Sequence, residues 1–142
     1  MIKEIHQKLV SQELTIDDLI TAYSSNIKKR NKELNAFLSI NEGVVLEEEI
    51  KNAKTVLQDN PKELLAGIPI AVKDNMLAKG LKATAASKIL ENYIAVEDAT
   101  VIQKLKKRGA IILGKTNLDE FAMGSSRLVL PKIIAPLFFN FG

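Results

Sequence analysis

The chain has 142 residues, 46% of them hydrophobic and 26% charged, which is typical of one globular domain. A net charge of +3, with Lys and Arg interspersed among Asp and Glu, does not form the basic stripe of a protein that holds nucleic acid directly, and the lack of Cys excludes disulfides and Cys-ligated metal sites. Neither an apolar signal-peptide core nor an apolar run of membrane-spanning length is evident, so we expect a cytoplasmic protein without membrane contact.

The first part of the chain is dominated by helical patterns. We expect a short helix over 1–10 and a second helix capped by Thr15, with Asp18 three residues later as in a capping box. Apolar residues at helical spacing follow the cap: Ile16, Leu19, Ile20, Tyr23 and Ile27. Residues 35–40 predict a short strand, and 44–57 predict a third helix whose glutamates form a solvated face.

The second part alternates strand and helix. Residues 67–75, "GIPIAVKDN", are apolar and β-branched, which is typical of a buried strand. Residues 76–97 predict a long irregular segment or a broken helix. We expect Asp98 to cap a helix that ends at Gly109, followed by a buried strand over 110–113. This order favours an α/β fold with a sheet covered on both faces.

Residues 109–116, "GAIILGKT", match the P-loop pattern of nucleotide-binding proteins. A P-loop needs a strand before the first glycine, a flexible loop between the glycines and a helix afterwards. Here a predicted helix precedes Gly109, and the Ala-Ile-Ile-Leu stretch prefers an extended backbone. We therefore interpret the stretch as a helix end, a buried strand and a turn at Gly114, and we expect no phosphate site. A further turn or short helix is expected over 116–123.

Lys73 is the strongest candidate for chemistry on position alone. It stands at the carboxyl end of the strand predicted over 67–75, and ligands in open α/β sheets bind at such strand ends. Loss of hydration there favours the neutral amine that a general base needs near pH 7. The alternatives are a lysine whose ammonium reaches solvent, or one that pairs with Asp74.

Other polar residues have simpler interpretations. His6 lies in a polar stretch and is expected to be a solvated surface residue. Asp119 and Glu120 fit the first turn of a short helix, where acidic side chains suit the helix dipole. No carboxylate cluster with the spacing of metal ligands stands out.

Composition changes near the end of the chain. Residues 127–142 contain no Asp or Glu, whereas the preceding 126 residues hold all 17. We therefore expect two segments: 1–126, the N-terminal part of a domain, and 127–142, a divergent apolar tail that is out of frame or disordered.

Four blocks of sequence, in order and at characteristic spacing, resemble the amidase signature family. They are "LNAFLSI", "GIPIAVKDN", "ASKILENY" and "DATVIQKLKKRGAIILGKTNLDEFAMGSS". Within the family they are most similar to the A subunits of aspartyl/glutamyl-tRNA(Asn/Gln) amidotransferases. The resemblance covers residues 8–126 and implies the N-terminal portion of an α/β fold with helices packed on a large mixed sheet.

The resemblance implies a chemistry and a set of site residues. Family members hydrolyse amides with a Ser–cis-Ser–Lys triad, in which Lys73 is the base toward the bridging serine. Met123, Gly124 and Ser125 match a block that borders the active site, so they are candidates for lining it. The family's "GGSSGGS" and "GSDTGGS" stretches, which hold the two serines, do not occur in these 142 residues.

The resemblance also implies partners and alternatives. The A subunit releases ammonia from glutamine, the B subunit uses ATP and Mg²⁺ to amidate the charged tRNA, and a small C subunit clasps the pair. We expect no cofactor in this chain itself. Because both serine stretches are missing, we expect a truncated or frameshifted chain that is inactive alone. The alternatives are a non-catalytic fragment that only docks on partner subunits, or a fragment of a general small-amide amidase.

Overall fold

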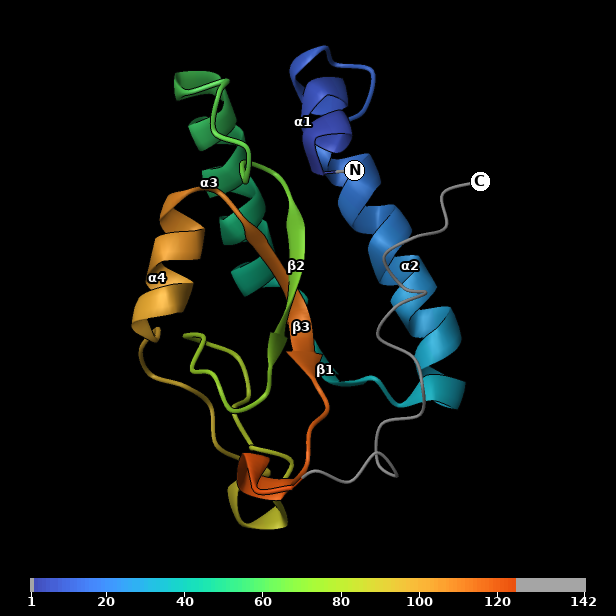
Figure 1. Ribbon diagram of the computed structural model, residues 1–142, viewed down its shortest axis with the longest axis vertical. Helices are drawn as coiled ribbons and strands as arrows, with labels where there is room; N and C mark the ends of the chain where they lie inside the picture. Colours follow the sequence, from blue (N-terminus) through green and yellow to red (C-terminus); the bar gives the residue numbers. More distant parts are fainter. Residues whose placement is uncertain (1, 125–142) are drawn as a thin grey trace.

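The computed structural model describes residues 2–124, and its elements follow the predicted order (Figure 1). They are α1 (Ile2–Val10), α2 (Ile16–Leu34), β1 (Phe37–Ile40), α3 (Val44–Asp59), β2 (Pro69–Lys73), the 3₁₀ turn η1 (Lys88–Leu90), α4 (Thr100–Lys107), β3 (Ile111–Thr116) and the 3₁₀ turn η2 (Glu120–Ala122). The predicted helices, the strand at 35–40, the irregular segment 76–97 and the turn within 116–123 are confirmed.

Strand β3 is the middle strand of the three-stranded sheet in this part of the chain, with the order β1-β3-β2. It runs antiparallel to β1 and parallel to β2, so the sheet is mixed, as predicted. The prediction of a wholly buried strand over 67–75 is wrong for β2. Among its own residues only Val72 is buried and Lys73 is exposed, because β2 lies at an edge of the described sheet.

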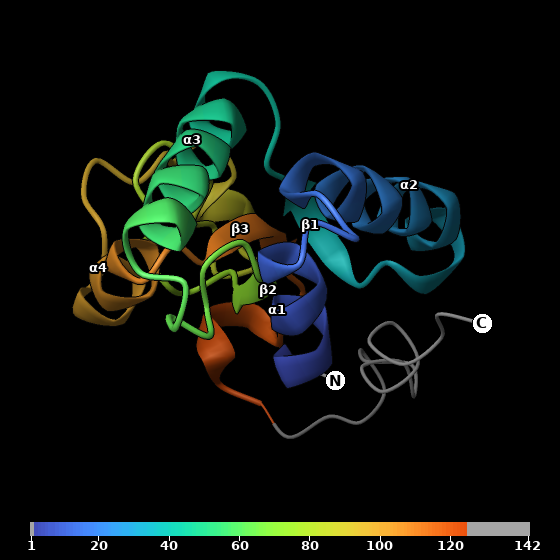
Figure 2. The ribbon, with the colours of Figure 1, turned by 90° about the horizontal axis from the view of Figure 1, so that it is seen from above.

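Both faces of the sheet carry an apolar cluster. In Figures 1 and 2, α2 and α4 lie on opposite sides of the strands. One cluster joins α1, α2 and α3 to the sheet through buried residues such as Leu9, Leu19 and Ile111. The other joins α4 to β2 and β3 through Ile102 and Ile112. The expected α/β architecture with a sheet covered on both faces is therefore confirmed.

The ends of the helices test the capping predictions. The Thr15 hydroxyl accepts a hydrogen bond from the backbone N–H of Asp18 at 3.1 Å, which confirms Thr15 as the cap of α2. Gly109 follows α4 with φ +73°, the left-handed conformation that favours glycine after a helix. The prediction that Asp98 caps α4 is wrong, because Ala99 occupies that position and no side chain caps the helix. The Asp98 carboxylate accepts instead from the backbone N–H of Lys79, at 2.7 Å.

The stretch "GAIILGKT" forms no phosphate-binding loop. Its prediction as a helix end and a buried strand is confirmed, but the predicted turn at Gly114 is wrong, because β3 continues through Thr116. Gly114 pairs with Ile40 of β1 and Ala71 of β2. A Cβ added there would collide with the carbonyl oxygen of Ser39, so a close approach of β1 explains the glycine.

The predicted tail over 127–142 and its boundary at Ser126 lie outside the described residues. Within 2–124, none of the helices combines the length and apolarity that a bilayer crossing requires.

Candidate active site at the carboxyl ends of β2 and β3

Strands β2 and β3 are parallel, so their carboxyl ends lie at one edge of the sheet, where α/β proteins bind ligands. Lys73 ends β2 and is the register partner of Thr116, which ends β3. The segments 74–98 and 117–124 continue from these strand ends and lie beside them (Figure 1). The predicted place of Lys73, at the carboxyl end of a strand, is confirmed; its catalytic role stays a prediction.

Lys73 is exposed, so the expected desolvation of its amine is wrong for the described residues. The reason is that Lys73 is the last residue of an edge strand. Asp74, the first residue after β2, is buried, whereas Lys73 is not. The alternative in which Lys73 pairs with Asp74 is also wrong, because the Asp74 carboxylate pairs with Lys115. The structure therefore shows the solvent-reaching alternative.

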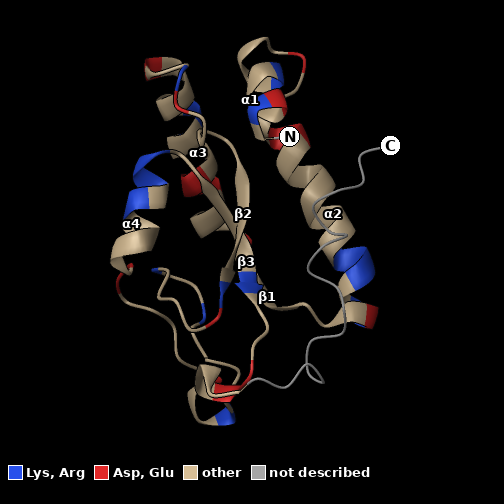
Figure 3. Cartoon of the chain, viewed as in Figure 1, with Lys and Arg blue, Asp and Glu red and all other residues tan. Residues whose placement is uncertain are grey.

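Asp74 and Lys115 form an ion pair with no exposed side-chain surface. The Lys115 Nζ lies 3.2 Å from Asp74 Oδ1 and also donates to the carbonyl oxygen of Lys82 at 2.9 Å. Asp74 Oδ2 accepts from the backbone N–H of Thr84 at 3.0 Å and from the Thr84 hydroxyl. Both carboxylate oxygens thus have partners, as a buried charge requires. Figure 3 shows the two signs of charge side by side at this end of β2 and β3.

Burial lowers the pKa of the Lys115 ammonium, and the charge and hydrogen bond of Asp74 oppose that effect. Lys115 occupies the lysine position of the P-loop pattern, where a phosphate-binding lysine has to reach its ligand. With no exposed surface, it serves the protein interior instead.

The same aspartate anchors the segment that crosses this edge of the sheet. The backbone N–H of Ala85 donates to the carbonyl oxygen of Asp74 at 3.2 Å, and the N–H of Phe121 donates to the carbonyl oxygen of Ala85 at 2.9 Å. Ala85, Ala86, Phe121 and Ala122 all have φ between +49° and +58°. Non-glycine residues rarely adopt this conformation, and such strain concentrates at functional sites. Asp74 therefore links β2 to two strained segments at the candidate site.

Met123 and Gly124 follow η2 at the end of the described residues, and Met123 is 81% exposed. A Cβ added at Gly124 would approach the Asp119 side chain to 2.7 Å, so this position is close-packed. Ser125 lies outside the described residues. A role for these three residues in lining the site stays a prediction.

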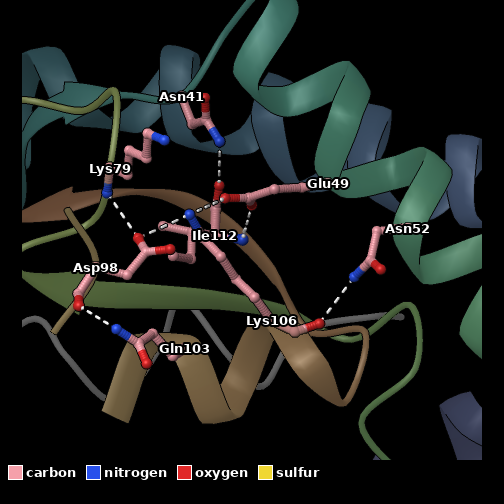
Figure 4. Close-up of polar contacts among 8 residues, drawn as sticks. All are labelled: Asn41, Glu49, Asn52, Lys79, Asp98, Gln103, Lys106 and Ile112. Atoms are coloured by element: carbon pink, nitrogen blue, oxygen red, sulfur yellow. Dashed lines mark hydrogen bonds and ion pairs between the residues drawn. The ribbon is translucent and has the colours of Figure 1, made fainter. Parts of the chain in front are cut away.

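A second polar network lies on the other half of β3 (Figure 4). Glu49 of α3 is buried, which contradicts the expected solvated face of glutamates at this one position. Its Oε2 accepts from the backbone N–H of Ile112 at 2.7 Å, and its Oε1 lies 3.3 Å from the Lys106 ammonium. Burial raises the pKa of Glu49, whereas the bond from Ile112 and the charge of Lys106 act in the opposite direction.

This network substitutes for strand pairing that β1 does not supply. Strand β1 ends at Ile40, and the side-chain amide of Asn41 donates to the carbonyl oxygen of Ile112 at 2.9 Å. Glu49 accepts from the Ile112 N–H, so side chains satisfy both backbone polar groups of Ile112. Lys106 extends the network to Asp98 at 3.0 Å. Its geometry explains how β3 is held, and it stands apart from the Lys73 edge.

His6 is 6% exposed on the inner face of α1, so its interpretation as a solvated residue is wrong. The apolar residues Ile5 and Leu9 draw that face of the helix into the core. Within the described residues, no group of three or more His, Asp or Glu side chains is arranged to hold a metal ion.

Sequence reasoning missed Asp74, Thr84 and Lys115 as one cluster. The available signal was a lysine directly after an apolar strand pattern, "AIILGK", since a charge there needs a partner when the strand is central. The partner itself could not be read from spacing, because the pair is 41 residues apart.

The sequence of the chain matches a known protein family. Residues 18–128 fit the sequence model of the family described as Amidase. The chain therefore belongs to the amidase family.

Individual relatives show which members of the family this chain is similar to. The proteins named as the A subunit of glutamyl-tRNA(Gln) amidotransferase from Pediococcus pentosaceus and from Sulfurisphaera tokodaii are 48% and 45% identical to this chain over 126 residues. The alignments cover 88% and 89% of this chain but 25% and 26% of those proteins. The chain thus spans about a quarter of the length of the curated relatives it matches.

Solved structures agree on the fold. The structure of the glutamyl-tRNA(Gln) amidotransferase A subunit from Thermotoga maritima matches with a TM-score of 0.60 and 38% identity, over 78% of this chain and 24% of that one. The peptide amidase from Stenotrophomonas maltophilia matches with a TM-score of 0.75 and 27% identity, over 84% of this chain and 25% of that one. The described residues therefore have the fold of one part of an amidase.

Proposed function

We propose that this chain supplies the lysine-bearing part of a glutamine-hydrolysing amidase, the A subunit of a tRNA amidotransferase. The observation that carries the proposal is the position of Lys73, which ends β2 at the carboxyl edge of the sheet and has an exposed side chain. Among the solved structures, the identity is 38% to the tRNA amidotransferase A subunit from Thermotoga maritima and 27% to the peptide amidase, which supports this branch of the family.

In the proposed reaction the neutral Lys73 amine accepts a proton from a bridging serine, which takes the proton of a nucleophilic serine. The nucleophile then attacks the side-chain amide of glutamine and releases ammonia, and water hydrolyses the resulting ester. The serine-bearing stretches of the family are not among these 142 residues. We therefore expect no turnover by this chain assayed alone, because the triad lacks its nucleophile.

The proposed partners follow from the resemblance to the A subunits of tRNA amidotransferases, since an A subunit implies further subunits. A B subunit would bind ATP and Mg²⁺ and transfer the ammonia to a mischarged tRNA, and a C subunit would hold the other two together. No cofactor is assigned to this chain, and no phosphate site is assigned to "GAIILGKT".

A chimera tests the proposal. Residues 2–124 of this chain replace the matched segment of the Pediococcus pentosaceus A subunit, and ammonia release from glutamine is measured. We expect the chimera to hydrolyse glutamine and Lys73→Ala to lower kcat by about 10²–10⁴-fold, the usual contribution of a general base. Lys79→Ala is the matched control, since Lys79 is also an exposed lysine in the segment that follows β2. A Lys73→Ala chimera as active as the Lys79→Ala chimera would overturn the assignment.

Docking without catalysis is the second candidate. Segment 89–96 exposes Ile89, Ile94 and Val96 at 85%, 53% and 75%, an apolar surface suited to burial against another polypeptide. Co-purification of the chain with a tagged B subunit, reduced by Ile89→Ser with Val96→Ser, is the expected result. Failure of the unsubstituted chain to associate would contradict docking.

The third possibility, a small-amide amidase, is supported by the TM-score of 0.75 to the peptide amidase.

A further inference from the structure

Two lysines and one aspartate meet at the carboxyl ends of β2 and β3, and only one lysine pairs with the aspartate. Lys73 and Asp74 are neighbours in sequence, yet Asp74 pairs with Lys115 of the adjacent strand. Thr84 occupies the second carboxylate oxygen with two hydrogen bonds. Within residues 2–124, Lys73 takes part in no hydrogen bond or ion pair through its side chain.

The register of β2 and β3 explains why Asp74 pairs with Lys115 and not with Lys73. Val72 and Lys115 are register partners, so their side chains share one face of the sheet, and Asp74 follows directly after the end of β2. This is the face that α4 covers, where Val72 packs with Ile102. Lys73 points to the opposite face by the alternation of the strand. Lys115 is therefore placed to reach the carboxylate, and Lys73 is placed away from it.

We propose, on the basis of the proposed function, that Lys115 is a positioning residue for Lys73: it holds the Asp74 carboxylate in a buried pair and so withholds that negative charge from the neighbouring lysine. A lysine can accept a proton only as the neutral amine, so it has to be deprotonated before it acts as a general base. A free carboxylate nearby would favour the charged ammonium instead. The Asp74–Lys115 pair has no net charge, so it orders the strand ends without that effect. Lys115 touches no substrate in this proposal and acts only through Asp74.

The other charged groups at this end of the sheet lie on the two segments that continue from β2 and β3. The segment between β2 and α4 carries Lys79, Lys82, Lys88, Glu91, Glu97 and Asp98, and the segment after β3 carries Asp119 and Glu120. Asp98 already pairs with Lys106. Strand β1 has no ionisable side chain, and α2 packs only Tyr23 into the apolar cluster on the Lys73 face. The basic last turn of α4 precedes β3 and therefore lies at the opposite end of the sheet.

The titration of the Lys73 amine in the 142-residue chain tests the proposal without any need for turnover. NMR of the ¹³Cε resonance follows the titration, and Lys73→Ala assigns the signal. We expect Lys115→Met to raise the Lys73 titration midpoint by roughly one pH unit, because Asp74 loses its counter-charge. Asp74→Asn should lower the midpoint by a similar amount, since Lys115 is then uncompensated. The double variant Asp74→Asn with Lys115→Met should return to the wild-type midpoint, and Lys79→Met is the control for general surface charge.

The double variant decides the matter even where a single variant fails to fold, because it leaves no unpaired buried charge. If Asp74 served Lys73 directly, removing both members of the pair would lower the Lys73 midpoint. A fall of roughly half a pH unit or more in the double variant would overturn the proposal. Equal midpoints in wild type and in a folded single variant would overturn it as well.

Failure here is distinguishable from failure of the proposed function, which shows as glutamine hydrolysis that survives Lys73→Ala in the chimera. In the same chimera, Lys115→Met should move the acidic limb of the pH profile of kcat/KM to higher pH, by the same shift that NMR measures for Lys73. A purely structural role for Lys115 would lower activity without moving that limb.

Discussion

Glu49 in α3 accepts a hydrogen bond from the backbone N–H of Ile112 in β3, across 2.7 Å and 63 residues of sequence. The bond ties a helix to the central strand at the point where β1 has already ended. It places a carboxylate in a site that is 7% exposed, with the Lys106 ammonium as its counter-charge. The Glu49 carboxylate therefore gains a hydrogen bond and an ion pair but loses its hydration. The pH dependence of the free energy of unfolding shows which effect is larger.

Because burial raises the pKa of Glu49 above its ordinary value of 4.5, the folded chain keeps a proton on this group at pH values where the unfolded chain has lost it. Its contribution to stability is fully present below that ordinary value and is lost as the pH rises through the raised one. We expect Glu49→Gln to become more stable relative to wild type as the pH rises from about 4.5 to about 8. Urea unfolding at several pH values measures the difference.

Glu48→Gln is the control, since Glu48 is the preceding residue of the same helix and is exposed. A wild-type advantage over Glu49→Gln that grows with pH would contradict this expectation, because Lys106 would then outweigh the loss of hydration.

Breaking the Asp74–Lys115 pair should be costly, whereas removing both charges should not. Each single variant, Asp74→Asn or Lys115→Met, leaves an uncompensated buried charge, which costs about 3–5 kcal/mol. The double variant should be destabilised by less than either single one. Chemical unfolding of the four proteins completes the cycle. Additive losses in the double variant would mean that the two side chains act independently.

Local patterns predicted much of this fold, because the signals for them lie within a few residues. Thr15 caps α2 through a bond to a residue three positions on, and Gly109 ends α4 through its own backbone conformation. Asp98 resembles a cap by the same local rule, but Lys79 and Lys106 compete for its carboxylate from elsewhere in the chain. Local reasoning cannot weigh such distant partners.

The candidate site was predictable in part for the same reason. The place of Lys73 follows from one strand pattern and its end. The burial of Lys115 depends on β3 lying between β1 and β2, and the exposure of Lys73 depends on β2 lying at the edge. Strand order is a property of the whole sheet, and neither periodicity nor composition encodes it within a single segment.

Gly114 should not tolerate a side chain. An added methyl group would meet the carbonyl oxygen of Ser39 and lie 3.1 Å from the Cα of Ile40, both in β1. We expect Gly114→Ala to lower the free energy of unfolding by about 1–3 kcal/mol, because the backbone of β1 has to move. Chemical unfolding measures the change, and a loss below about 0.5 kcal/mol would contradict the close approach of β1.

His6 should be a site of stabilising substitution. Its imidazole is 6% exposed, and its Nε2 has no hydrogen-bond partner within the described residues. A buried polar atom without a partner costs about 1–3 kcal/mol. His6→Leu, of similar size, should therefore raise the melting temperature, whereas Lys8→Leu on the exposed face of α1 should not. A lower melting temperature for His6→Leu would mean that the imidazole makes a favourable contact.

The role proposed for Lys73 is that of the base in the release of ammonia from glutamine. The most direct measurement uses the chimera assembled with the Pediococcus pentosaceus B and C subunits, and compares amidation of mischarged tRNA with glutamine and with free ammonium as the nitrogen source. We expect Lys73→Ala to lower the glutamine-dependent rate by about 10²-fold or more while the ammonium-dependent rate is unchanged. Glutamine-dependent amidation at the rate of the Lys79→Ala control would contradict the claim.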